Sequence, residues 1–228
     1  MAKEKQLIIG LGSGRSGTVS LAHLLNSQPN SYFIHEGFFR ENPKHVLRMY
    51  GDLLPWNIDA LKLDTFLDKL EIKSGDSRMY GCVASYFLPY VEIIHKKVPS
   101  AVFICLKRDK EETIQSFKLK SGKNHWSQNA DVGSSIWDMI HPKYDTQDID
   151  EALGNYWDEY YAKASQLAQK YPEHFKVFPI DVLNTEAGLN ELLDFAQFPK
   201  DNRTITPSKA YNSNTNSLVA NFKDYLSL

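Results

Sequence analysis

The chain has 228 residues, 42% of them hydrophobic, and a formal net charge of −2. This length is enough for one sizeable core, and the charge gives no reason to expect nucleic acid or an anionic membrane as a partner. No apolar run approaches the ~20 residues of a membrane span, and the N-terminus leads directly into a strand-like run, so we expect a cytoplasmic protein without a membrane span or signal peptide.

A glycine-rich turn follows the first predicted strand, residues 6–11, and a helix is expected to begin near Gly17. Glycines allow successive backbone N–H groups to point at one place, and a helix N-terminus adds partial positive charge there. Basic and hydroxyl side chains supply further donors for phosphate or sulfate oxygens. The turn is therefore predicted to bind an anion, the alternative being an ordinary βα turn. Its residues are Gly12, Ser13, Gly14, Arg15, Ser16, Gly17 and Thr18.

Two familiar nucleotide loops can be compared with this turn. A Walker A loop needs a lysine directly after its last glycine, whereas Thr18 follows Gly17 here, which argues against an ATPase or kinase. The spacing of the glycines at 12, 14 and 17 satisfies a dinucleotide fingerprint, and Glu36 stands about where the ribose-binding acid is expected. A single such fingerprint is weak, so this interpretation stays open.

The second predicted strand covers residues 32–35 and ends in His35 and Glu36. Because consecutive βαβ units are right-handed and usually adjacent, we expect its carboxyl end to lie beside that of the first strand. Ligands bind at this edge of an open parallel sheet. Both side chains are thus predicted to lie near the glycine-rich turn.

The middle of the chain continues the alternation of helices and strands. A helix is expected over 58–72, a third strand over 79–85 and a helix up to about Lys97. The apolar run 101–106 predicts a fourth strand buried on both faces.

The segment after the fourth strand carries two further candidate residues. A helix is expected from Asp109, which stands in capping-box spacing with Glu112. On that helix Ser116 shares a side with Asp109, so Arg108 and Ser116 are predicted to hold one phosphate. The alternative is a surface Arg108 paired with Asp109 or Glu112.

Residues 121–150 are rich in polar residues and glycine, and they are predicted to form a lid or acceptor-binding insertion. An amphipathic helix is expected over 151–171, with its aromatic stripe packed in the core. A last strand at 175–180 and a helix over about 189–196 follow. The order of elements predicts one α/β domain over residues 1–228, a three-layer α/β/α arrangement around a mainly parallel sheet.

Three separated segments together resemble the sulfotransferases that use 3′-phosphoadenosine 5′-phosphosulfate, abbreviated PAPS. Residues 12–18 are similar to the family's 5′-phosphosulfate loop, and 102–109 with Ser116 are similar to its 3′-phosphate segment. Residues 178–183 and the following helix look like its closing strand, acidic residue and helix. The resemblance implies a P-loop-like sulfotransferase fold. Two positions depart from the usual pattern, because Arg15 stands where many members carry lysine and Lys110 where proline is usual.

The resemblance also implies an activity, which is metal-independent transfer of a sulfuryl group from PAPS to a hydroxyl or amine of a small-molecule or glycan acceptor. Arg15 and the backbone amides of residues 13–18 are expected at the 5′-phosphosulfate, and Arg108 with Ser116 at the 3′-phosphate. Glu36 is our first candidate for the general base, with its pKa raised by partial burial, and His35 is the alternative.

Two other functions remain compatible with the sequence. An NAD(P)-dependent oxidoreductase of the Rossmann type would explain the glycine spacing and Glu36, but it leaves Arg108 and Ser116 without a role. A non-catalytic nucleotide-binding protein would keep the loop and bind PAPS without transferring the sulfuryl group. The cysteines, Cys82 and Cys105, lie in apolar runs and are expected to be buried thiols, without the spacing of a metal site.

Overall fold

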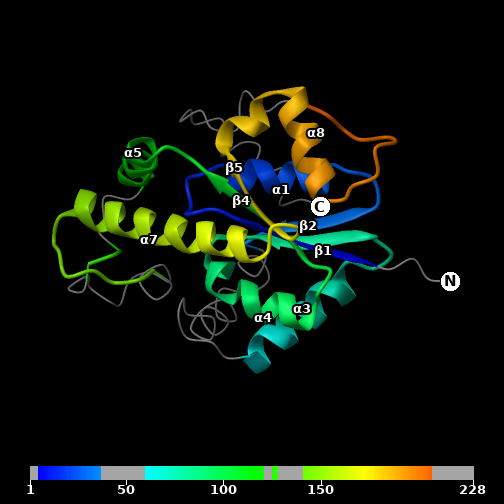
Figure 1. Cartoon of the computed structure of the whole chain (residues 1–228), viewed down its shortest axis with the longest axis horizontal. Coiled ribbons are helices and arrows are strands. Elements are labelled where there is room, and N and C mark those ends of the chain that lie inside the picture. Colours follow the sequence, from blue (N-terminus) through cyan, green and yellow to red (C-terminus); the bar gives the residue numbers. More distant parts are fainter. Residues whose placement is uncertain (1–4, 37–59, 121–124, 128–140, 207–228) are drawn as a thin grey trace.

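The structure, a computed structural model, describes residues 5–36, 60–120, 125–127 and 141–206. Its centre is a sheet of five parallel strands in the order β2-β3-β1-β4-β5 (Figure 1). The strands are β1 (Gln6–Leu11), β2 (Ser31–His35), β3 (Met79–Val83), β4 (Val102–Lys107) and β5 (Phe175–Pro179).

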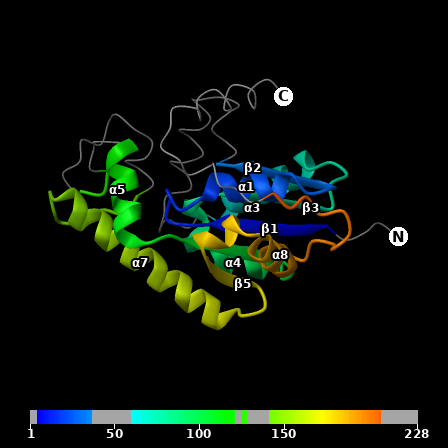
Figure 2. The same ribbon diagram turned by 90° about the horizontal axis from the view of Figure 1, so that it is seen from above.

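Helices cover both faces of this sheet (Figures 1 and 2). One face packs against α3 (Ala60–Lys73), α4 (Val91–Lys97) and α7 (Ile149–Lys170), and the other against α1 (Thr18–Asn26) and α8 (Glu186–Phe195). Alternate residues of β1 show the division, because Leu7 and Ile9 join the first core and Ile8 joins the second. The expected three-layer α/β/α fold is confirmed.

The order of the strands differs from the sequence-based expectation in one place. β3 pairs with both β1 and β2, so β2 lies at the edge of the sheet and not beside β1. Burial explains the difference, since every residue of β3 is buried whereas only Phe33 of β2 is. The more apolar strand takes the interior position.

Most predicted elements agree with the structure to within a few residues. The expected helix before Lys97 begins with a 3₁₀ segment, η1 (Ser85–Tyr90), which contains Pro89, and becomes α-helical only at Val91. Proline lacks the N–H that an α-helix interior requires, which explains the break. A second 3₁₀ segment, η2 (Ile180–Asn184), joins β5 to α8, and α5 (Lys110–Lys120) follows β4.

One predicted segment is described only in part. The predicted insertion at 121–150 includes 121–124 and 128–140, which lie outside the described residues. Within the described part of the chain, none of the helices combines the length and hydropathy needed to traverse a bilayer. Cys82 and Cys105 are both buried free thiols, as expected.

Candidate functional site

The glycine-rich loop, residues 12–18, lies at the carboxyl end of β1 and leads into α1. Arg15 has a φ of 55°, a left-handed conformation that L-residues rarely adopt, and Gly17 at the start of the helix has a φ of 86°. Gly12 allows a close approach, because a Cβ there would lie 2.2 Å from Ser16 Oγ. These conformations compress the turn, with Ser13 and Ser16 fully buried.

The first half of the loop is hydrogen-bonded to tyrosines of α7. Gly12 N donates to Tyr160 Oη at 3.1 Å, and Ser13 N donates to Tyr161 Oη at 3.4 Å. Tyr156 Oη donates to the carbonyl oxygen of Ser13 at 2.9 Å. The amide of Ser13, which we expected to face the anion, is therefore directed to a tyrosine.

The second half of the loop keeps its donors available. In the portion of the chain that the structure describes, the backbone N–H groups of Gly14, Arg15, Ser16, Gly17 and Thr18 form no hydrogen bond. Ser16 Oγ is also buried without a hydrogen-bond partner there, although it lies close enough to Tyr161 to affect its pKa. Unsatisfied buried donors are costly, so this half of the loop suits a ligand rich in acceptor oxygens.

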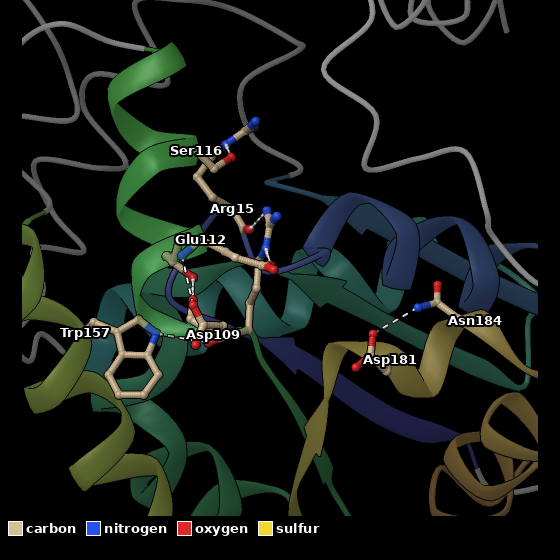
Figure 3. Close-up of polar contacts among 9 residues, drawn as sticks. Arg15, Asp109, Glu112, Ser116, Trp157, Asp181 and Asn184 are labelled. Atoms are coloured by element: carbon tan, nitrogen blue, oxygen red, sulfur yellow. Dashed lines mark hydrogen bonds and ion pairs between the residues drawn. The ribbon is translucent and has the colours of Figure 1, made fainter.

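Two arginines and a serine meet beside the loop (Figure 3). Arg15 Nε donates to Ser116 Oγ on α5 at 3.0 Å, and Arg108 Nη1 donates to the Arg15 carbonyl oxygen at 3.3 Å. Burial lowers the pKa of Arg15, and the positive charge of Arg108 lowers it further. The structure thus brings the two segments that the sequence predicts to bind anions into direct contact.

Arg108 is also paired with a carboxylate. Its Nε lies 3.0 Å from Glu112 Oε2, one helical turn along the chain (Figure 3). Only half of the predicted capping box forms, because Asp109 Oδ1 accepts from Glu112 N at 3.0 Å while the Glu112 carboxylate faces Arg108. The surface pairing that the sequence left open is therefore present together with the contact to the loop.

His35 reaches the loop even though β2 is not adjacent to β1. Its Nε2 lies 3.1 Å from Thr18 Oγ1 at the beginning of α1. This places the imidazole next to the N-terminus of the helix.

Glu36 stands just beyond the end of β2, with a φ of 46° and its N–H donating to Val83 O at 3.1 Å. Since Glu36 has left the extended conformation, strand alternation does not determine its direction relative to His35. Its surface is partly exposed, yet the carboxyl lies deep enough that burial raises its pKa to about 7 against the opposing charge of Lys120. Lys120 ends α5, the helix that carries Ser116.

The acidic residue after β5 takes no part in this cluster. Figure 3 shows Asp181 and Asn184 together on η2, away from the contact between Arg15 and Ser116. Asn184 Nδ2 donates to Asp181 Oδ1 at 3.1 Å. η2 nevertheless closes the loop from its side, because Ile180 would lie 3.2 Å from a Cβ at Gly17.

Two observations bear on cofactors. Among the described ranges, no group of three or more His, Cys, Asp and Glu residues is arranged to hold a metal ion. The sheet order places β3 beside β1, whereas the dinucleotide-binding order 3-2-1-4-5 places β2 there. The oxidoreductase interpretation therefore loses its structural basis, and Glu36 lies one strand further from β1 than that fold requires.

Comparison with solved structures identifies the fold. A sulfotransferase from Alicyclobacillus acidocaldarius aligns over 100% of this chain and 92% of its own, with a TM-score of 0.52 and 13% identity. The chain has a P-loop-like α/β/α fold. A shikimate kinase from Bacteroides thetaiotaomicron aligns over 85% of this chain and 99% of its own, with a TM-score of 0.47 and 12% identity. No protein-family model and no curated protein sequence matches the chain significantly.

Proposed function

We propose that this protein is a PAPS-dependent sulfotransferase that acts on a hydroxyl or amine of a small-molecule or glycan acceptor. The observation that carries the proposal is the contact of Arg15 with both Ser116 and Arg108. Two cationic side chains and a hydroxyl from separate segments meet where the free loop amides and the buried Ser16 hydroxyl lie. This set of donors fits the phosphate and sulfate groups of PAPS.

The residues have different roles in binding. The free amides of the loop, Ser16 and Arg15 would hold the 5′-phosphosulfate, and Arg108 with Ser116 would hold the 3′-phosphate. Arginine stays protonated at working pH, so Arg15 stabilises charge on the leaving oxygen without donating its proton. Binding of the nucleotide would replace Glu112 at Arg108 Nε, because that carboxylate occupies a donor that the phosphate needs. Ser116 Oγ accepts from Arg15, so its own O–H remains available to donate to the 3′-phosphate.

The reaction is a substitution at sulfur. A bond forms between the acceptor oxygen or nitrogen and sulfur, while the bond from sulfur to the bridging oxygen of the phosphosulfate breaks and its electrons go to the phosphate. The acceptor proton passes to the carboxylate of Glu36. A carboxyl with a pKa of about 7 is ionised in a useful fraction near neutral pH and is a stronger base than an ordinary glutamate.

His35 is the alternative base. Its contact with Thr18 at the start of α1 favours a role in fixing the loop over one in proton transfer. A base must reach the acceptor, and this imidazole already uses Nε2 within the protein.

Transfer of labelled sulfate tests the proposal directly. The protein is incubated with PAPS and a panel of small alcohols, phenols, amines and sugars, and labelled products are separated from the donor. Product that requires the native protein supports the proposal. Binding of adenosine 3′,5′-bisphosphate without transfer to any acceptor class would instead support a non-catalytic nucleotide-binding protein.

A further inference from the structure

One face of α7 holds the backbone of both anion-binding segments. Tyr156, Trp157, Tyr160 and Tyr161 occupy two successive turns of this helix and project toward the carboxyl ends of the strands. Their polar atoms form hydrogen bonds to main-chain groups of the loop, of β4, of Arg108 just after β4, and of η1. The helical spacing of these residues predicts that their rings pack in the core. Core packing alone does not explain why their hydroxyl and indole N–H groups all bond to the backbone around the anion-binding segments.

The hydroxyls fix three consecutive peptide units. The unit joining Leu11 and Gly12 is held through Gly12 N, the next through Ser13 N, and the third through the Ser13 carbonyl oxygen. We name the three tyrosines, Tyr156, Tyr160 and Tyr161, the tyrosine bracket. Each peptide plane of the first half of the loop therefore has its own tyrosine.

Two of these hydroxyls also donate to carbonyl oxygens outside the loop, one at the start of η1 and one in β4. Tyr160 Oη donates to Ser85 O at 3.0 Å, and Tyr161 Oη donates to Leu106 O at 2.8 Å. A tyrosine hydroxyl has one proton, so each of them must accept from the loop amide that it contacts. Tyr161 is buried and its pKa is raised to about 12, which keeps this proton in place at neutral pH.

Trp157 extends the same arrangement to the second anion-binding segment. Its Nε1 donates to Arg108 O at 3.2 Å (Figure 3), and Lys107 Nζ lies 4.8 Å from the centre of its ring. The carbonyl of Arg108 and the amides of Gly12 and Ser13 are thus all hydrogen-bonded to side chains of one helix, α7.

We infer that the tyrosine bracket, with Trp157, is a positioning element that sets the loop so that its remaining amides face the ligand together with Arg108. The hydroxyls turn the amides of Gly12 and Ser13 away from the anion and leave those of residues 14–18 to bind it. None of the four side chains needs to touch the substrate. The ligand part of this inference rests on the proposed function, whereas the geometric part does not.

Hydrogen exchange and binding test the inference in parallel. In Tyr160→Phe and Tyr161→Phe, the amide of Gly12 or Ser13 loses its acceptor, and its exchange rate measured by NMR should rise about tenfold or more, the equivalent of one hydrogen bond. The affinities for pyrophosphate and for adenosine 3′,5′-bisphosphate should fall by a similar factor. Tyr171→Phe, at the far end of the same helix, is the matched control and should change neither property.

The outcomes separate the two proposals. Wild-type protein that binds pyrophosphate but not adenosine 3′,5′-bisphosphate would refute the proposed function and leave the bracket intact. Unchanged exchange at Gly12 and Ser13 in the variants overturns the bracket, and so does lower thermal stability with unchanged affinity of the folded protein. If Tyr160→Phe does not fold, Tyr161→Phe and Tyr156→Phe decide the question, since a positioning role requires weaker binding of pyrophosphate in each.

Discussion

Arg15 Nε donates to Ser116 Oγ at 3.0 Å, so the loop after β1 and the second turn of α5 are joined by side chains 101 residues apart in sequence. Ser116 is buried, and Arg108 Nη1 donates to the carbonyl oxygen of Arg15 at 3.3 Å, so the three residues form one cluster. An anion placed between them would find donors from both segments.

Replacing Arg108 tests the second anion-binding segment. Arg108→Ala should weaken binding of adenosine 3′,5′-bisphosphate by ~1.5–3 kcal/mol, the range for hydrogen bonds to charged groups, as measured by titration calorimetry. Arg78→Ala, an exposed arginine just before β3, is the matched control and should bind normally. Equal affinities of wild type and Arg108→Ala would remove Arg108 from the site.

The carboxylate of Glu112 should compete with the ligand for Arg108. Glu112→Gln removes a negative charge from an exposed ion pair worth only ~0.3–0.5 kcal/mol to stability, so the fold should tolerate it. We expect adenosine 3′,5′-bisphosphate to bind several-fold more tightly at low salt, and the gain to shrink as salt is added. Glu111→Gln on the same turn controls for the change in net charge, and an equal gain there would argue against competition at Arg108.

Glu36 is expected to control the chemical step. Glu36→Gln should lower turnover by ~10²-fold or more, the usual contribution of a general base, while nucleotide affinity survives. In the wild type, the rate should increase as the pH is raised through about 7, because the carboxyl must be ionised to accept a proton. Near-normal turnover in Glu36→Gln would remove Glu36 as the base and direct attention to His35.

The same carboxyl should make stability depend on pH. Its pKa is raised from 4.5 to about 7 on folding, so the folded state binds this proton more tightly than the unfolded state. The contribution is fully present below pH 4.5 and is lost as the pH rises to about 7. Urea unfolding across this range should show a loss of stability that Glu36→Gln lacks, and identical pH profiles would show that Glu36 is not buried as described.

Gly12 should be intolerant of a side chain. A Cβ there would lie 2.2 Å from Ser16 Oγ and 3.1 Å from Leu106 O, so Gly12→Ala should destabilise the protein by ~1–3 kcal/mol in urea unfolding. Gly154→Ala, within α7, provides the opposite case. Its Cβ would meet only the end of the flexible Lys110 side chain, and alanine in a helix should be neutral or stabilising by up to ~1 kcal/mol.

The sequence predicted the elements well because their signals are local. The apolar run ending at Leu106 predicts β4, and the glycines after Leu11 predict the turn into α1. The position of β3 between β1 and β2 was not predictable from adjacency alone, since strand order depends on the burial of all the strands together. Burial of every residue of β3, against one residue of β2, is the physical reason that the rule of neighbouring strands fails here.

The candidate site shows the same limit. Arg108 and Ser116 could be predicted to act together, because Ser116 shares a side of the following helix with Asp109, the neighbour of Arg108. The contact of Arg15 with Ser116 joins segments 101 residues apart, and no local pattern in either segment indicates it. The tyrosines of α7 were identified as buried, which is correct for Tyr156, Tyr160 and Tyr161. Their hydroxyls are the signal for a further role, because each buried hydroxyl needs a hydrogen-bond partner. Three such hydroxyls on one helix predict that it packs against several exposed backbone polar groups.

Arg15 and Glu36 are two of the five non-glycine residues with positive φ among those that the structure describes, and each forgoes roughly 1 kcal/mol of folding free energy in that conformation. The chain accepts this cost at the positions that carry its proposed anion-binding cation and its proposed base. A screen that rewards heat resistance alone would consequently favour glycine or asparagine at both places, so thermostable variants of this protein should be checked first for the loss of these two side chains.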